Sequence, residues 1–142
     1  MWRVPNNQPG AGLTGVTESN KPARPVIFVV DDEPMLLELA AIVLEPAGYR
    51  VEAFRDPNEA LAAYQQSAAR PELVITDYAM RPFNGMDLVA RCKALHAAQK
   101  VVLVSGTVGR EVFENASVKP DSFLAKPYQA EELRELVRNL IG

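Results

Sequence analysis

The stretch that most constrains the fold is the run 73–76, three apolar residues and a threonine, which is followed directly by Asp77. Its β-branched character, and the prolines Pro71 upstream and Pro82 downstream, predict a short strand buried on both faces. Burying a large apolar side chain contributes roughly 1.5–3 kcal/mol, so we expect this strand at the centre of a sheet. An aspartate directly after a strand lies where open α/β sheets place their chemistry, although it also commonly begins a turn.

From Val26 onward, apolar runs alternate with helical patterns. Continuous apolar strands joined by helices predict an α/β fold, a doubly wound sheet of five parallel strands with five helices in a single domain. The expected strands are 26–30, 49–54, 73–76, 100–104 and 122–125, and the expected helices are 34–44, 58–66, 87–95, 109–116 and 131–140.

Length and composition set the domain organisation. The chain has 142 residues, of which 48% are hydrophobic, which is enough for one packed core. Residues 1–25 are rich in Pro, Gly, Asn, Ser and Thr and predict a flexible tail, and residues 26–142 form the expected domain. A G-x-G-x-x-G pattern at 10–15 lies within that tail with no strand before it, so it predicts no dinucleotide site.

Several function classes are excluded by composition. No stretch reaches the roughly 18 consecutive apolar residues of a membrane span, and the N-terminus lacks the apolar region of a secretory signal. The single cysteine, Cys92, excludes an internal disulfide framework, and the single histidine, His96, excludes a His-rich metal site. A formal net charge of −3 argues against direct nucleic-acid binding. We therefore expect a cytoplasmic protein without membrane or nucleic-acid contacts.

Polar residues follow four of the expected strands, and a parallel sheet brings these positions to one edge. Carboxylates within about 4 Å repel by about 4 kcal/mol per pair at an effective dielectric near 20, so a cation such as Mg²⁺ is expected among them. A lysine and a hydroxyl beside them complete the parts for phosphoryl transfer to an aspartate. The residues are Asp31, Asp32, Glu33, Asp77, Ser105 and Lys126.

Each of these features has a plainer interpretation when it is taken singly. The acidic run 31–33 could simply begin a helix, Ser105-Gly106 could be an ordinary turn, and Lys126 could be a surface lysine. Their coincidence at the same end of four strands favours the phosphoryl-transfer interpretation.

The order and spacing of these residues resemble the CheY-like receiver domain of two-component response regulators, from Val26 to Leu140. The matching motifs are Val29-Val30-Asp31-Asp32-Glu33, Asp77 with Met80 and Gly85, Ser105-Gly106, and Phe123-Leu124-Ala125-Lys126-Pro127.

This resemblance implies that Asp77 is the phosphoacceptor. It also implies that Asp32, Asp77 and the Ala79 backbone carbonyl bind Mg²⁺, with Asp31 acting through water. Ser105 and Lys126 would hold the phosphoryl oxygens, Phe123 would be an aromatic switch coupled to Ser105, and Lys126–Pro127 would be a cis peptide.

The implied partner is a sensor histidine kinase or a histidine phosphotransfer protein. A receiver of this kind is not an enzyme in the usual sense, because it catalyses only its own phosphorylation and dephosphorylation. The resemblance names no downstream effector, and a stand-alone regulator and a piece of a larger protein both stay open.

The chain departs from the family pattern at several places. Arg81 stands where a proline is usual and Pro82 comes one residue late, so the loop after Asp77 is expected to take a different path. Residues 119–121 replace a usual Gly-Ala pair, and the expected helix 109–116 is weakly patterned.

A helical projection of residues 34–44 predicts how that helix is used. It places Leu36, Leu39, Ala40 and Val43 toward the sheet, and Met35, Leu37, Ala41 and Ile42 toward solvent. Exposed apolar surface often marks an interaction site, so we expect a partner to dock there. The expected docking surface is Met35, Leu37 and Ile42, together with Pro127 and Tyr128.

Two alternative functions compete with the phosphoacceptor hypothesis. The first is a degenerate receiver that serves as a phosphorylation-independent binding module. The second is a Mg²⁺-dependent phosphatase with an aspartyl nucleophile, of the haloacid-dehalogenase kind. Such phosphatases use a second aspartate two residues after the nucleophile, and Ala79 stands at that position here.

Overall fold

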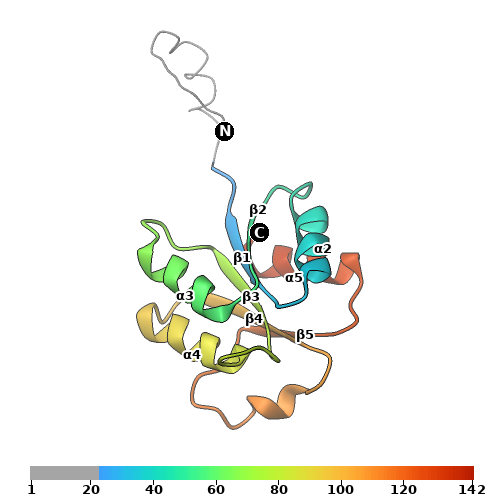
Figure 1. Cartoon of the computed structure of the whole chain (residues 1–142). Coiled ribbons are helices and arrows are strands. Elements are labelled where there is room, and N and C mark those ends of the chain that lie inside the picture. The colour runs from blue at the N-terminus through green and yellow to red at the C-terminus, as the bar shows by residue number, and fades with distance from the viewer. Residues whose placement is uncertain (1–22) are drawn as a thin grey trace, which may run out of the picture.

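The computed structural model describes residues 23–142, so the predicted tail 1–25, including the pattern at 10–15, lies outside the described residues except for 23–25. Five strands form one parallel sheet, as predicted, and their order is β2-β1-β3-β4-β5 (Figure 1). The strands are β1 (Val26–Val30), β2 (Arg50–Phe54), β3 (Leu73–Asp77), β4 (Lys100–Ser105) and β5 (Ser122–Ala125). The helices are α2 (Pro34–Leu44), α3 (Pro57–Gln66), α4 (Gly85–Leu95) and α5 (Ala130–Ile141), with a short 3₁₀ turn η1 (Arg110–Val112).

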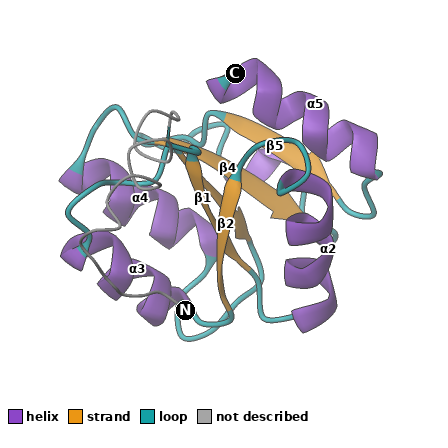
Figure 2. Cartoon of the chain, turned by 90° about the horizontal axis from the view of Figure 1, so that it is seen from above, coloured by secondary structure: helices purple, strands orange, loops and turns teal. Residues whose placement is uncertain are grey.

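Helices cover both faces of the sheet, with α2 and α5 on one face and α3 and α4 on the other (Figure 2). Side chains alternate between the two faces along a strand, so one strand contributes side chains to both hydrophobic cores. Ile27 and Val29 of β1 lie in the core under α2 and α5, whereas Phe28 and Val30 lie in the core under α3 and α4. Burial on both faces explains why this strand is apolar throughout. No helix within residues 23–142 has the length and apolar character needed to cross a bilayer.

The strand β3 is the centre of the fold, as its sequence predicts. It pairs with β1 on one side and β4 on the other, and all five of its residues are buried. Because the sheet is parallel, the carboxyl ends of β1, β3, β4 and β5 share one edge. That edge carries the residues that were predicted to gather there.

The helix starts are defined by local capping. In α4 the Asn84 side chain accepts a hydrogen bond from the Asp87 N–H at 2.9 Å, and the Asp87 carboxylate accepts one from the Asn84 N–H at 3.1 Å. In contrast, α2 begins at Pro34, and the side chain of its N-cap residue, Glu33, makes no capping hydrogen bond. The Glu33 carboxylate is therefore available to the edge of the sheet.

The prediction of a helix over residues 109–116 is wrong. Within the described residues there are four α-helices, not five, and this segment forms only the turn η1. Glycine at 109 and β-branched Val112 weaken helix formation. Phe113 instead turns inward, 9% exposed, and its ring centroid lies 5.9 Å from that of Phe123.

The predicted orientation of α2 is wrong at Leu37, which is 7% exposed and belongs to the core. Met35 and Ile42 are exposed as predicted, at 80% and 66%. Leu36 and Leu39 are only half-buried. The helix packs against α5 as well as the sheet, so its buried stripe is rotated by about one residue from the predicted one.

Candidate functional site

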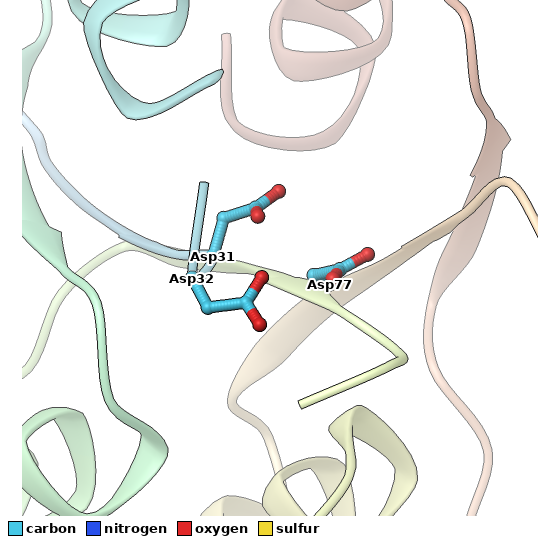
Figure 3. A group of neighbouring side chains, drawn as sticks. All are labelled: Asp31, Asp32 and Asp77. Carbon is cyan, nitrogen blue, oxygen red and sulfur yellow. The ribbon is translucent and has the colours of Figure 1, made fainter. Parts of the chain in front are cut away.

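Three aspartates meet at the carboxyl edge of the sheet. Asp31 and Asp32 follow β1, and Asp77 is the last residue of β3 (Figure 3). One carboxylate oxygen of each lies within 4.8 Å of the others. Asp31 and Asp77 are buried, at 5% and 6% exposure, whereas Asp32 is exposed. The predicted acidic cluster is therefore present, with two of its members inside the protein.

Lys126 reaches this cluster from the end of β5. Its Nζ lies 3.1 Å from Asp31 Oδ2 and 3.0 Å from Asp77 Oδ1, and 3.6 Å from Glu33 Oε1. The Lys126 backbone N–H donates to the Ser105 carbonyl at 2.9 Å, and the Lys126–Pro127 peptide is cis, as the resemblance implies. Glu33 was predicted to lie at this edge, but its ion pair with Lys126 was not predicted.

Burial and charge act together on the ionisable groups. Burial raises the pKa of Asp31 above its usual 3.8, against the hydrogen bonds donated by the Glu33 N–H and Lys126. Burial likewise raises the pKa of Asp77, despite its hydrogen bond from Lys126, and the charge of Asp31 adds to the effect. Burial opposes the charge of Lys126, but its hydrogen bonds to Asp77 and Asp31 prevail and raise its pKa above 10.5. The cluster is thus short of positive charge.

The hydroxyl of Ser105 is buried and engaged with its own loop. Its Oγ accepts hydrogen bonds from the backbone N–H groups of Thr107 at 3.1 Å and Val108 at 3.0 Å. A hollow over the acidic cluster is lined by neighbouring residues of this loop and not by Ser105 itself. The lining residues are Asp32, Glu33, Asp77, Ala79, Gly106, Thr107 and Lys126.

The loop after Asp77 takes a tight path. The Tyr78 carbonyl accepts hydrogen bonds from the N–H groups of Met80 at 3.1 Å and Gly85 at 2.9 Å. The Arg81–Pro82 peptide in this loop is cis. A second hollow, lined by Asp32, Ala79, Met80 and Arg81, adjoins the acidic one. The position of Arg81 beside the cluster was not predicted.

The remaining predicted positions lie on β5, in the loop after it and along α2. Phe123 is half-buried between Phe113 and Arg110, whose guanidinium carbon lies 5.6 Å from the Phe123 ring centroid. Pro127 and Tyr128 line an apolar hollow beside α2 with Leu36, Leu39, Gly106 and Lys126. Met35 and Ile42 are exposed on α2, whereas Leu37 is not.

A doubly wound parallel sheet that carries a buried carboxylate cluster and a lysine at its carboxyl edge places the chain in a class of α/β domains whose polar site lies beyond the ends of the strands. Comparison with known proteins names the family. Residues 27–138 match the family model described as the response regulator receiver domain.

Individual proteins show the same similarity. The chain is 32% identical over 112 residues to the DNA-binding response regulator MtrA of Mycolicibacterium smegmatis, covering 79% of this chain and 48% of that protein. A response regulator receiver protein from Pseudomonas putida has a TM-score of 0.74 at 30% identity, covering 84% of this chain and 99% of that one. A CheY-like receiver domain from Methanospirillum hungatei JF-1 has a TM-score of 0.75 at 25% identity, with 82% and 93% covered.

The chain belongs to the response regulator receiver domain family. Members of this family work in two-component signalling and are not enzymes acting on separate substrates, as predicted. The chain spans about half the length of the MtrA relatives that it matches.

Proposed function

We propose that Asp77 accepts a phosphoryl group and that the domain thereby switches conformation in a two-component phosphorelay. The observation that carries this proposal is the position of Lys126, whose Nζ lies 3.0 Å from Asp77 Oδ1 inside a buried carboxylate cluster. In this mechanism the Asp77 carboxylate attacks phosphorus. Lys126 then holds an oxygen of the product, and Ser105 joins it once its hydroxyl is released from its own loop.

The donor set fits Mg²⁺. Hard carboxylate and carbonyl oxygens are the ligands that Mg²⁺ prefers, and Asp31 and Asp77 of the three clustered carboxylates share the charge of one lysine, Lys126. Asp32, Asp77 and the Ala79 carbonyl would hold the ion, and Asp31 would act through water. A bound Mg²⁺ supplies positive charge that offsets the carboxylates and the developing charge on the phosphoryl oxygens.

Membership of the receiver family implies a histidine kinase as partner. We infer that a histidine-bearing partner, whether a kinase or a phosphotransfer protein, docks on the exposed apolar side chains of α2, Met35 and Ile42, and on Pro127 and Tyr128. Pro127 and Tyr128 border the acidic hollow, because the hollow that they line shares Gly106 and Lys126 with it. Leu37 is omitted from the docking surface because it is buried.

Labelling by a small phosphodonor tests the proposal. Incubation with acetyl phosphate and Mg²⁺, followed by intact-mass measurement, should show the gain of one phosphoryl group. Asp77→Asn keeps the shape and removes the nucleophile, so it should gain none, and chelation of Mg²⁺ should abolish labelling of the wild type. Equal labelling of Asp77→Asn would refute the assignment, and an unlabelled wild type would favour a phosphorylation-independent binding module.

Matched surface variants test the docking face. Met35→Glu with Ile42→Glu should slow transfer from a histidine-phosphorylated partner and leave acetyl phosphate labelling unchanged. Arg134→Glu with Arg138→Glu on α5 is the control. If both donors were slowed together, the substitutions would have damaged the pocket, and the docking proposal would fail.

A further inference from the structure

The aromatic ring of Phe123 lies between a buried ring and a surface cation. The centroid of the Phe113 ring is 5.9 Å away, and Phe113 is only 9% exposed. The guanidinium carbon of Arg110, an exposed residue, lies over the Phe123 ring at 5.6 Å from its centroid. A guanidinium within about 6 Å of an aromatic centroid is attracted to the face of the ring. Arg110 therefore helps to hold Phe123 in its present place.

No carboxylate competes with the ring for the guanidinium of Arg110. Within residues 23–142 this guanidinium forms no ion pair of 4.0 Å or less. The carboxylate of the next residue, Glu111, accepts a hydrogen bond from the Gly109 N–H at 2.9 Å. The contact with Phe123 is thus the interaction in which the charge of Arg110 takes part.

Arg110 and Phe113 belong to one segment that is tied to the hydroxyl of Ser105. The Ser105 Oγ accepts hydrogen bonds from the backbone N–H groups of Thr107 at 3.1 Å and Val108 at 3.0 Å. The turn η1 begins two residues after Val108, and Phe113 follows it directly. The segment between β4 and β5 contains no α-helix, so its position depends on contacts such as these.

The paired strands β4 and β5 connect the ring to the acidic site. Leu103 of β4 is the register partner of Phe123, and Ser105 is the partner of Ala125. The residue after Ala125 is Lys126, whose backbone N–H donates to the Ser105 carbonyl at 2.9 Å. The ring, the hydroxyl and the lysine of the site therefore lie within a few residues of one another on two adjacent strands.

We propose that the contact of Arg110 with Phe123 is autoinhibitory. It stabilises the unphosphorylated arrangement of the segment between β4 and β5, and it is lost when the domain switches. This inference rests on the proposed function, in which the hydroxyl of Ser105 leaves its own loop to join a phosphoryl oxygen. The two N–H groups of that loop then lose their acceptor, so the loop rearranges and carries η1, with Arg110, away from the ring.

The size of the effect follows from the kind of contact. A contact that exists in only one of two states shifts the equilibrium between those states by its own free energy. For a cation–π contact at an exposed site this corresponds to about a two- to fivefold change in the equilibrium. A ligand that binds only the switched state gains apparent affinity by the same factor when the contact is removed.

Beryllofluoride with Mg²⁺, which occupies the place of a phosphoryl group, measures this equilibrium. Its half-saturating concentration, read from near-ultraviolet circular dichroism, should fall about two- to fivefold in Arg110→Ala. Arg110→Lys should give an intermediate value, because it keeps the charge and loses the planar group. Lys119→Ala removes an exposed cation from the same segment and is the matched control, which should leave the value unchanged.

Amide hydrogen exchange without beryllofluoride tests the same contact independently of the acidic site. The N–H groups of Thr107 and Val108 should exchange about two- to fivefold faster in Arg110→Ala, because the segment leaves Ser105 more often. In Lys119→Ala they should exchange as in wild type. In a Phe123→Leu background, which has no ring, Arg110→Ala should have no further effect on either measurement.

The outcomes separate this inference from the proposed function. An unchanged or raised half-saturating concentration in Arg110→Ala, an equal fall in Lys119→Ala, or unaltered exchange of the two amides in Arg110→Ala would overturn the inference. A wild type that neither binds beryllofluoride nor is labelled by acetyl phosphate would refute the proposed function and this inference with it. A wild type that is labelled on Asp77, with Arg110→Ala binding beryllofluoride as wild type does, would refute this inference alone.

Discussion

Neutralising Asp77 should stabilise the metal-free protein. The acidic oxygens of Asp31, Asp32 and Asp77 lie within 4.8 Å of one another, so each repulsion that involves Asp77 costs about 3.5 kcal/mol at an effective dielectric of about 20. The ion pair between Asp77 and Lys126, at 3.0 Å, returns about 5.5 kcal/mol on the same scale. The two repulsions exceed the ion pair, so Asp77→Asn should raise the free energy of unfolding by about 1.5 kcal/mol.

Magnesium should make wild type more stable than Asp77→Asn. At a concentration of about one hundred times its dissociation constant, a ligand that binds only the folded state stabilises it by about 2.7 kcal/mol. The variant lacks one proposed ligand and should lose most of this gain. Wild type should therefore be the less stable protein in a chelator and the more stable one in Mg²⁺.

Urea unfolding followed by circular dichroism, with and without Mg²⁺, measures both effects. Glu114→Gln, which neutralises an exposed acid outside the cluster, is the matched control and should change little. A metal-free Asp77→Asn that is less stable than wild type would refute the reasoning, because it would show that Lys126 outweighs the repulsion.

Three further outcomes are expected. Lys126→Ala should weaken the beryllofluoride response about tenfold or more, since a charge-assisted hydrogen bond worth roughly 1.5–3 kcal/mol is lost; a response equal to wild type would remove Lys126 from the mechanism. Burial raises the pKa of Asp31 and Asp77 above 3.8, so the folded chain binds these protons more tightly than the unfolded chain. The stabilisation that comes from this tighter proton binding is therefore complete below pH 3.8 and is lost as the pH rises through the pKa values of the two aspartates in the folded chain. Urea titrations across this pH range should show a smaller change in the free energy of unfolding for Asp77→Asn than for wild type. Gly85→Ala should destabilise the fold by about 1–3 kcal/mol, because its Cβ would collide with the Asp77 carbonyl oxygen and lie 2.8 Å from Leu103 Cδ1. A variant as stable as wild type would show that the loop can move to accommodate the added methyl group without cost.

The sheet was predictable from the apolar runs that form its strands, and the acidic cluster was predictable from the parallel order of those strands. Residues 73–75 are apolar without alternation, which is typical of a strand that is covered on both faces. The parallel topology then brings Asp31, Asp77 and Lys126 to one edge without further information. The structure bears this out, with Lys126 within 3.1 Å of both carboxylates.

The errors occurred where apolar residues have more than one possible partner. The helix α2 is apolar nearly all round, so its sequence does not distinguish the side that meets the sheet from the side that meets α5. Tertiary packing selects Leu37 for the core and leaves Leu36 and Leu39 half-buried. In the segment before β5, the packing of Phe113 on Phe123 overrides a weak local preference for helix.

Contacts that depend on the paths of the loops could not be predicted from the sequence. The approach of Glu33 to Lys126, the engagement of the Ser105 hydroxyl by Thr107 and Val108, and the place of Arg81 beside Asp32 depend on loop paths. No periodicity encodes those paths.

Locating the phosphoryl group within the chain tests the central claim most directly. The acetyl phosphate-labelled protein is reduced with borohydride, which converts an aspartyl phosphate to homoserine, and the peptides are sequenced by mass spectrometry. The proposed mechanism predicts homoserine at position 77 and unmodified aspartate at 31 and 32. Homoserine at either of those two positions, with Asp77 intact, would contradict it.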